Sequence, residues 1–296
     1  MTSDPIDTTT ATDTAPAIAV NELSFSYRNQ DEHALEDISL SVEEGEFLGI
    51  VGKTGAGKTT LLSAMCGIIP FNTAGNLSGT IQVRGRPVTD YESIHDISST
   101  VSMVLDSPEN QLFNLHVRDE IMWGPENMGV DKEEILRRTE EAIELFDLKG
   151  YEKRITYTLS GGEKQKVAIA SVYAMSPDII LLDEPTSQLD PIGTEMVFDA
   201  IDSLLNEGVT IVMVEHKIEE LAQYADRIAH LASGKLQIVT DTRSFFIENR
   251  GVAPPQVTDL GLSLRNDGID HEIPLTLEEG TNEYANLLNP WSDRRE

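Results

Sequence analysis

The chain contains a single cysteine, Cys66, so no disulfide can form within it. Such a chain is typical of a reducing compartment, and we expect Cys66 to be a small buried residue on a helix. Residues 1–17 have neither a basic start nor an apolar run, so they lack the pattern of a signal peptide. No apolar run approaches the roughly 18 residues that span a bilayer, so work at a membrane would need other chains to cross it.

Basic residues are also scarce: 22 lysines and arginines face 51 aspartates and glutamates, which gives a net charge of −29. This excess is spread along the chain and is not confined to its ends. Because contact with phosphate backbones needs basic clusters, the charge argues against a nucleic-acid partner. It indicates either an ordinary solvated acidic surface or adaptation to high salt, where screening relieves self-repulsion. We favour the second interpretation, a halophilic protein.

Short apolar runs alternate with amphipathic helical stretches along most of the chain. Alternation at 17–27 and 38–42 predicts two strands, and the continuous run 47–52 predicts a buried strand that feeds a helix. Residues 79–88 predict a further strand pair, and strands at 178–183 and 209–216 flank a helix at 192–206. We therefore predict an α/β fold with a mostly parallel sheet covered on both faces, joined by an antiparallel β subdomain.

Three segments depart from this alternation. Residues 1–17 are small, polar and acidic, and are predicted to be a disordered tail before a main domain at 18–250. Residues 107–158 are predicted to be a helical insert, because Ile135, Thr139, Ala142, Ile143 and Phe146 recur at helical spacing. Residues 251–296 are weakly patterned and form an extension that is either a small helical appendage or partly disordered.

The sequence GKTGAGKT at 52–59 fits the phosphate-binding pattern G-x-x-x-x-G-K-[ST] and lies between the buried strand and its helix. Glycines let backbone N–H groups converge on phosphate oxygens, and the helix N-terminus adds its positive end. Lys58 is predicted to reach the β- and γ-phosphates of a nucleotide, and Thr59 to ligate Mg²⁺. The predicted phosphate-binding residues are Gly52, Lys53, Thr54, Gly55, Ala56, Gly57, Lys58, Thr59 and Thr60.

The sequence IILLDEP at 179–185 supplies a matching acidic pair. Its apolar residues predict a buried strand that delivers Asp183 beside the magnesium site. Glu184 follows at once and is placed to polarise the attacking water. The pair is a weak signal alone and a strong one together with the glycine loop.

Further motifs resemble the ATP-binding cassette (ABC) family over about residues 18–245. LSGGEKQ at 159–165 is similar to the family signature, and SQLD at 187–190 looks like the loop that follows its acidic pair. His216 stands where the family places a switch histidine, and Tyr27 where an aromatic ring stacks on adenine. The resemblance implies an ABC-type P-loop ATPase that uses ATP and Mg²⁺, with Glu184, His216 and Lys58 as catalytic residues.

The resemblance also explains why one chain carries two phosphate-binding elements. In this family two cassettes pair head to tail, and the signature of one closes over the γ-phosphate held by the other. It implies that Ser160, Gly161, Gly162 and Glu163 serve the nucleotide of a second cassette, which can be the same or a different chain.

Within the family, SPENQLF at 107–113, VEHK at 214–217 and the C-terminal extension most resemble the energy-coupling factor importers of vitamins and metals. This implies a peripheral protein at the cytoplasmic face of the membrane. Its partners there would be a transmembrane coupling protein and a substrate-capturing membrane protein. The alternative is a soluble ABC ATPase in iron–sulfur assembly, nucleic-acid or ribosome work. Lys58 and Ser160 lie only about 100 residues apart, too close for the long coiled-coil insertion of chromosome-type members.

One position departs from the family pattern. After VL at 104–105 the family has a glutamine, whose neutral oxygen contacts Mg²⁺, and this chain has Asp106. We expect Asp106 to remain a magnesium-site residue, because a carboxylate oxygen also suits this cation. The alternative is that Asp106 belongs to the acidic surface and that Gln111 reaches the metal.

Overall fold

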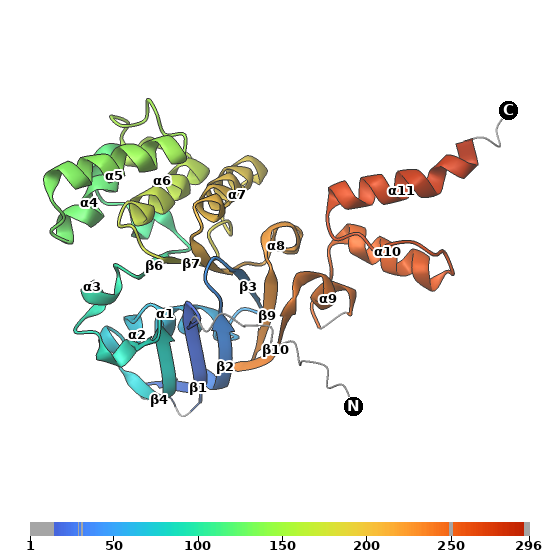
Figure 1. Cartoon of the computed structure of the whole chain (residues 1–296), viewed down its shortest axis with the longest axis horizontal. Coiled ribbons are helices and arrows are strands. Elements are labelled where there is room, and N and C mark those ends of the chain that lie inside the picture. Colours follow the sequence, from blue (N-terminus) through green and yellow to red (C-terminus); the bar gives the residue numbers. More distant parts are fainter. Residues whose placement is uncertain (1–14, 29, 31, 249–250, 293–296) are drawn as a thin grey trace, which may run out of the picture.

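The computed structural model of the chain describes residues 15–28, 30, 32–248 and 251–292. It contains an antiparallel four-stranded sheet and a six-stranded sheet (Figure 1). The four-stranded sheet has the order β2 (Leu35–Val42), β1 (Ile18–Tyr27), β4 (Gly75–Val83) and β5 (Arg86–Pro87). The six-stranded sheet has the order β10 (Lys235–Asp241), β9 (Arg227–Ala232), β3 (Phe47–Val51), β8 (Thr210–Val214), β7 (Ile179–Asp183) and β6 (Val101–Val104).

All pairs from β9 to β6 are parallel, and only β10 runs antiparallel at one edge. This confirms the predicted α/β class, with its mostly parallel sheet and its antiparallel subdomain. Every residue of β3, β7 and β8 is buried, as expected for strands covered on both faces.

Helix α1 (Lys58–Met65) lies in the core shared by the two sheets. Leu61 and Leu62 pack in one cluster with Leu48 and Ile50 of β3 and with residues of β1 and β2. Cys66 ends this helix and is buried, as predicted, and burial raises the pKa of its thiol to about 11. The short segments that follow are α2 (Ile68–Phe71), the 3₁₀ turn η1 (Val88–Asp90) and α3 (Ile94–Ile97).

The opposite face of the six-stranded sheet carries most of the helices (Figure 1). The chain leaves β6 through the 3₁₀ turn η2 (Pro108–Asn110) and returns to the sheet after the turn η3 (Thr156–Thr158). Ile135, Thr139, Ala142, Ile143 and Phe146, predicted to form one helical face, are all buried. The helices on this side are α4 (Val117–Asn127), α5 (Lys132–Leu145), α6 (Gly161–Tyr173), α7 (Pro191–Asn206), α8 (Ile218–Tyr224) and α9 (Thr242–Ile247).

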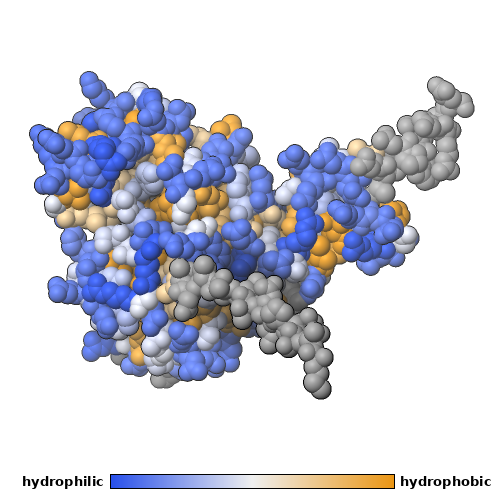
Figure 2. All heavy atoms as spheres, viewed as in Figure 1, coloured by the Kyte–Doolittle hydropathy of each residue, from blue (hydrophilic) through white to orange (hydrophobic). Residues whose placement is uncertain are grey.

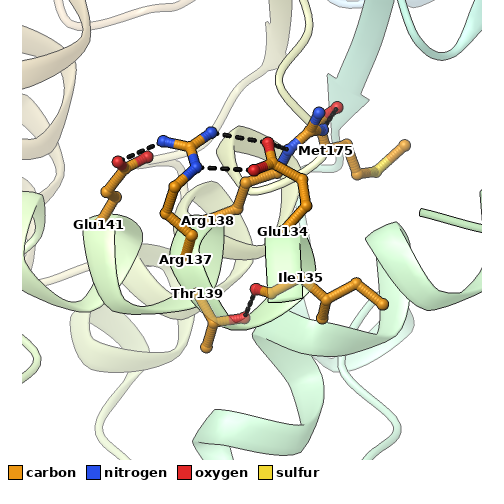
Figure 3. A network of polar contacts seen from close by, with 7 residues as sticks. All are labelled: Glu134, Ile135, Arg137, Arg138, Thr139, Glu141 and Met175. Carbon is orange, nitrogen blue, oxygen red and sulfur yellow. Dashed lines mark hydrogen bonds and ion pairs between the residues drawn. The ribbon is translucent and has the colours of Figure 1, made fainter. Parts of the chain in front are cut away.

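Arginines of α5 form a network of ion pairs on the helical insert (Figure 3). Arg137 pairs with Glu134, one turn earlier, and with Glu141, one turn later. Arg138 also pairs with Glu134 and donates to the carbonyl oxygen of Met175 at 3.1 Å, which ties α5 to the chain just after α6. Hydrogen bonds from both arginines lower the pKa of Glu134 to about 2. Exposed pairs of this kind contribute little to stability and are screened by salt.

The C-terminal extension consists of α10 (Gln256–Asn266) and α11 (Leu277–Ser292), which stand beside α9 (Figure 1). Of the two alternatives left by the sequence, the described part is thus a small helical appendage. Arg243 of α9 pairs with Glu279 of α11 at 2.8 Å. Apolar side chains are exposed on this extension, including Leu260, Ile269 and Leu277, and Figure 2 shows hydrophobic atoms there.

The predicted acidic tail falls mostly outside the described residues, which begin at residue 15. Ala17, its last residue, is buried, and its carbonyl oxygen accepts a backbone hydrogen bond from Arg84. The division into a tail, a domain at 18–250 and an extension stays a prediction. Among the described residues, no helix combines the length and the apolar character needed to cross a membrane.

The charge of −29 leads to a prediction about salt. We expect the melting temperature to rise as KCl increases toward molar concentration, because screening of self-repulsion outweighs the loss of exposed ion pairs. Thermal melts in a KCl series measure this. Glu195 and Asp199 are exposed like charges one turn apart on α7, so a Glu195→Gln, Asp199→Asn control should depend less on salt. Maximal stability of the natural chain at low salt would contradict the halophilic interpretation.

Candidate active site

The glycine loop connects β3 to α1 and can be built only from glycine at two of its positions. A Cβ at Gly52 would lie 2.2 Å from the carbonyl oxygen of Leu231. Gly57 has a φ of 101°, and a Cβ there would lie 2.5 Å from the carbonyl oxygen of Ala34. Gly57 precedes α1 without a side-chain cap, so the first N–H groups of the helix remain available for an anion.

A cavity of about 380 Å³ opens on this loop, and its walls include Tyr27, Gly55, Lys58, Thr59 and Glu184. The hydroxyl of Tyr27 is 2.9 Å from that of Thr60, so the end of β1 is tied to α1. Thr54 and Thr60 also line this cavity. Lys53 and Ala56 lie instead on a neighbouring cavity of about 420 Å³, which shares Thr54 and Gly55 with the first and extends to His230.

Lys58, Glu184 and His216 converge although they come from three different elements. Glu184 Oε1 lies 2.9 Å from His216 Nε2 and 3.4 Å from Lys58 Nζ. Lys58 Nζ lies 3.4 Å from the same Nε2 of His216, and the tautomer in which Nε2 carries the proton donates to the Glu184 carboxylate. Lys58 is buried and also donates to the carbonyl oxygen of Gly52 at 3.0 Å, which holds the ammonium inside the loop.

Glu184 has an unusual backbone. Its φ is 47°, in the left-handed region that non-glycine residues rarely occupy. The backbone N–H of Glu184 donates to the carbonyl oxygen of Val214 at 2.9 Å, which extends the pairing of β7 and β8 by one residue. This turn directs the carboxylate to Lys58 and His216.

Asp183 and Thr59 form an oxygen-rich site next to this group. Asp183 is buried, and its Oδ1 has no hydrogen-bond partner among the described residues. Burial raises the pKa of Asp183 most, and the negative charges of Glu184 and Asp106 raise it further, against a hydrogen bond from Thr59 and the charge of Lys58. An unpartnered buried carboxylate oxygen beside a hydroxyl fits a hard cation such as Mg²⁺.

The described residues contain no group of three or more His, Cys, Asp or Glu side chains that could hold a metal ion. Mg²⁺ commonly takes one or two protein carboxylates and completes its shell with phosphate and water oxygens, and Asp183 offers such a carboxylate. The site therefore fits a metal that arrives with a nucleotide.

Asp106 and Gln111, the two alternative ligands, have different surroundings in the loop after β6. The side-chain oxygen of Gln111 accepts a hydrogen bond from the backbone of Leu105 at 3.0 Å, so it is already engaged within the loop. Gln165 of α6 donates to the carbonyl oxygen of Leu105 at 3.1 Å and fixes the loop from the other side. Asp106 is exposed and close enough to Asp183 to raise its pKa.

The signature residues begin α6 and do not line the cavity of the glycine loop. Ser160 caps the helix: its hydroxyl accepts from the backbone of Glu163, and the carboxylate of Glu163 accepts from the backbone of Ser160 at 2.8 Å. Although burial raises the pKa of Glu163, hydrogen bonds from Arg154, Ser160 and Tyr151 lower it to about 2. The Glu163 side chain thus stabilises its own helix end, where Ser160 and Gly161 are exposed and Gly162 is buried.

Gly162 also makes a close backbone contact. A Cβ on it would lie 2.6 Å from Cα of Gly193 in the first turn of α7. The signature therefore packs directly on the helix that follows the acidic pair.

Two groups of residues at the site were missed by sequence reasoning. Gln30, Glu32 and His33 line the cavity, but the sequence indicated only a polar connection between two strands. Glu215 and Thr186 form a buried hydrogen bond behind His216. No sequence signal joins them, because they meet only when β7 and β8 pair.

Comparison with known proteins shows the family to which this chain belongs. The sequence pattern of the ABC transporter family matches residues 35–187. An ABC transporter ATP-binding protein of Pyrococcus abyssi is 38% identical over 278 residues, which are 92% of this chain and 99% of the relative. The energy-coupling factor transporter ATP-binding protein EcfA1 of Caldanaerobacter subterraneus is 36% identical over 88% of this chain and 96% of the relative. A relative in Methanosarcina mazei is 37% identical, but this chain spans only 46% of its length.

Two solved structures share the fold. CbiO1 of Clostridium perfringens, described as part of the ABC transporter complex CbiONQ, has a TM-score of 0.73 and 29% identity, covering 86% of this chain and 97% of that one. A dimeric ATP-binding cassette in a post-hydrolysis state, bound to ADP and phosphate, has a TM-score of 0.66 and 25% identity, covering 77% of this chain and all of that one. The chain belongs to the ABC transporter family and is an ATPase of that family.

Proposed function

We propose that this chain is the ATP-binding and ATP-hydrolysing subunit of an energy-coupling factor importer and works as a head-to-tail dimer of cassettes. The observation that carries the proposal is that the chain has two phosphate-binding elements, of which only the glycine loop lines the cavity with Lys58 and Glu184. Ser160 and Gly161 are exposed at the start of α6 and do not line that cavity. They are therefore suited to the nucleotide of a second cassette.

The relatives support the importer type and the pairing. EcfA1 is named as an energy-coupling factor subunit, CbiO1 is described within a transporter complex, and a second structural neighbour is dimeric with ADP and phosphate bound. The proposed partners are a transmembrane coupling protein and a substrate-capturing membrane protein for a vitamin or a metal. With these partners, the chain would work at the cytoplasmic face of the membrane.

The contacts between these side chains support a proposed role for each of them in hydrolysis. Lys58 binds the β- and γ-phosphates in place of its present contacts with Gly52 and Glu184. Glu184 accepts a hydrogen bond from the attacking water and orients it, and His216 fixes the carboxylate from 2.9 Å away. The aromatic ring of Tyr27 stacks on the adenine. The signature N–H groups of the second cassette stabilise charge on the γ-phosphate.

Thr59 and Asp183 would hold Mg²⁺, with Asp106 beside them. Bound Mg²⁺ neutralises charge on the phosphates. Among the residues that the structure describes, none donates a hydrogen bond to the buried Oδ1 of Asp183, so this oxygen is available to the cation.

The position of Asp106 leads to a prediction about magnesium. Its negative charge near the γ-phosphate disfavours the nucleotide until Mg²⁺ compensates, so Asp106→Gln should lower the Mg²⁺ midpoint of ATPase activity by roughly threefold or more. Asp106→Ala, which also removes the oxygen, should lower the maximal rate. The measurement is ATPase rate against Mg²⁺ at fixed ATP for the natural chain and both variants. If the three curves share one midpoint and one maximum, Asp106 has no role at the site.

The proposed function is tested by isolating the tagged chain from membranes in mild detergent and identifying what remains in stoichiometric complex. A polytopic membrane protein in fixed ratio to one or two cassettes is the expected result. A chain recovered without membrane protein, or bound to ribosomes, nucleic acid or iron–sulfur assembly proteins, would favour a soluble ABC ATPase. Cooperative ATP hydrolysis by the purified chain would show that it pairs with itself, whereas activity only after adding a different cassette would indicate a heterodimer.

A further inference from the structure

Glu215 is a fully buried carboxylate to which no role has been assigned so far. It follows β8 directly, and only 1% of its surface is exposed. Oε1 accepts from the backbone N–H groups of His216 at 2.7 Å and Lys217 at 3.2 Å, and Oε2 accepts from the hydroxyl of Thr186 at 2.7 Å. Burying a carboxylate is costly unless hydrogen bonds satisfy its oxygens. Three donors do so here, and together they hold the Glu215 carboxylate in one position.

These bonds join two segments on either side of the catalytic group. One segment is the turn that carries His216, whose ring lies against Glu184. The other begins at Thr186, two residues after Glu184, and runs into α7. Lys217 makes a second link between the same segments, because its Nζ contacts the hydroxyl of Thr194 in the first turn of α7.

The segment from Thr186 to Thr194 leads on to the signature. A Cβ on Gly161 would lie 2.8 Å from a methyl carbon of Leu189, and a Cβ on Gly162 would lie 2.6 Å from Cα of Gly193. At Gly162 the backbone of α6 contacts the backbone of α7, which leaves little room for the two helices to move independently. One side of the segment is thus bound to the His216 turn, and the other side is packed on α6.

We propose that Glu215 is a positioning residue that holds His216 beside Glu184. Through its bond to Thr186, it also links this catalytic group to the chain's own signature, which faces a second cassette. This rests on the proposed function in one respect, the pairing of cassettes. Any displacement of His216 on nucleotide binding is passed through Glu215 to the segment that supports Gly161 and Gly162. The two nucleotide sites of a dimer then respond together.

The test removes the hydrogen bond between Thr186 and Glu215 by changing each partner in turn. Glu215→Met deletes the acceptor oxygens, and Thr186→Val deletes the hydroxyl with nearly unchanged shape. Both are expected to lower kcat about tenfold, to leave KM for ATP within about twofold, and to lower the Hill coefficient of ATP hydrolysis toward one. Thr186→Ser keeps the hydroxyl and should restore both kcat and cooperativity. Glu219→Gln, an exposed carboxylate on α8, is the matched control and should behave as the natural chain.

The double variant Glu215→Met, Thr186→Val should be no slower than the worse single variant, because both changes remove the same bond between Glu215 and Thr186. Additive losses, or natural cooperativity in a folded Thr186→Val variant, would overturn the proposal. So would a fall in melting temperature with unchanged kcat, since that is a purely structural role. If the natural chain hydrolyses ATP cooperatively and the variants match it, this inference alone fails. If the natural chain does not pair at all, the proposed function fails, and with it the joining of two sites.

Discussion

Glu184→Gln is expected to lower ATP turnover by at least about a hundredfold while ATP binding is retained. Proton transfer by a positioned side chain typically contributes about 10²- to 10⁴-fold, and a carboxamide cannot accept the proton of the attacking water. The variant also removes one of three neighbouring negative charges, since Glu184 and Asp106 both lie close to Asp183. Repulsion toward the phosphates therefore falls, and nucleotide affinity should be equal or higher.

Single-turnover hydrolysis and equilibrium binding of ATP separate these two effects. Size-exclusion chromatography with ATP and Mg²⁺ should show the closed dimer accumulating in the variant. Glu195→Gln, an exposed carboxylate on α7 that does not line the cavity, is the control and should keep full turnover. Loss of ATP binding in Glu184→Gln, or turnover near that of the natural chain, would remove Glu184 from its proposed role.

Gly162→Ala is expected to have the second largest effect. Alanine suits a helix better than glycine by about 1 kcal/mol, so any loss must come from the contact with Gly193. Because the opposing atom is a backbone Cα at 2.6 Å, α6 and α7 must move apart, at a cost of about 1–3 kcal/mol of unfolding free energy. A shift of about 1 Å at the signature can lower turnover about a hundredfold.

Gly161→Ala is the matched comparison, because its Cβ would meet only the end of the Leu189 side chain, which can rotate away. Chemical denaturation and ATPase assays on both variants measure the difference. Equal stability of the two alanine variants would show that the Gly162 contact is not tight in solution.

The sequence could predict the parts of the fold that local patterns specify. The glycine loop and the acidic pair were found because each combines a fixed motif with a short apolar run, and the fold class followed from strand–helix alternation. Strands β6, β9 and β10 were not predicted. β6 has only four residues, and β9 and β10 are partly exposed strands without a turn motif as distinctive as the glycine loop.

The site could be predicted only to the level of motifs. Ser160 and Glu163 fit the capping-box pattern of a serine followed three residues later by a glutamate, and that signal could have assigned Glu163 to its helix end. The bond between Thr186 and Glu215 joins residues 29 positions apart, and the contact of Gly162 with Gly193 joins two helices. Such contacts depend on how the strands and helices pack, which no local pattern records.

The left-handed backbone of Glu184 has an evolutionary consequence. A non-glycine residue pays about 1–2 kcal/mol for this conformation, whereas glycine, asparagine and aspartate adopt it more readily. Selection for a stable fold and selection for ATP hydrolysis therefore act in opposite directions at this one position. If a duplicated copy of the gene no longer needed to hydrolyse ATP, position 184 is where drift toward those residues should appear first. Among paired cassettes, the residue at this position then identifies which of the two sites still turns over.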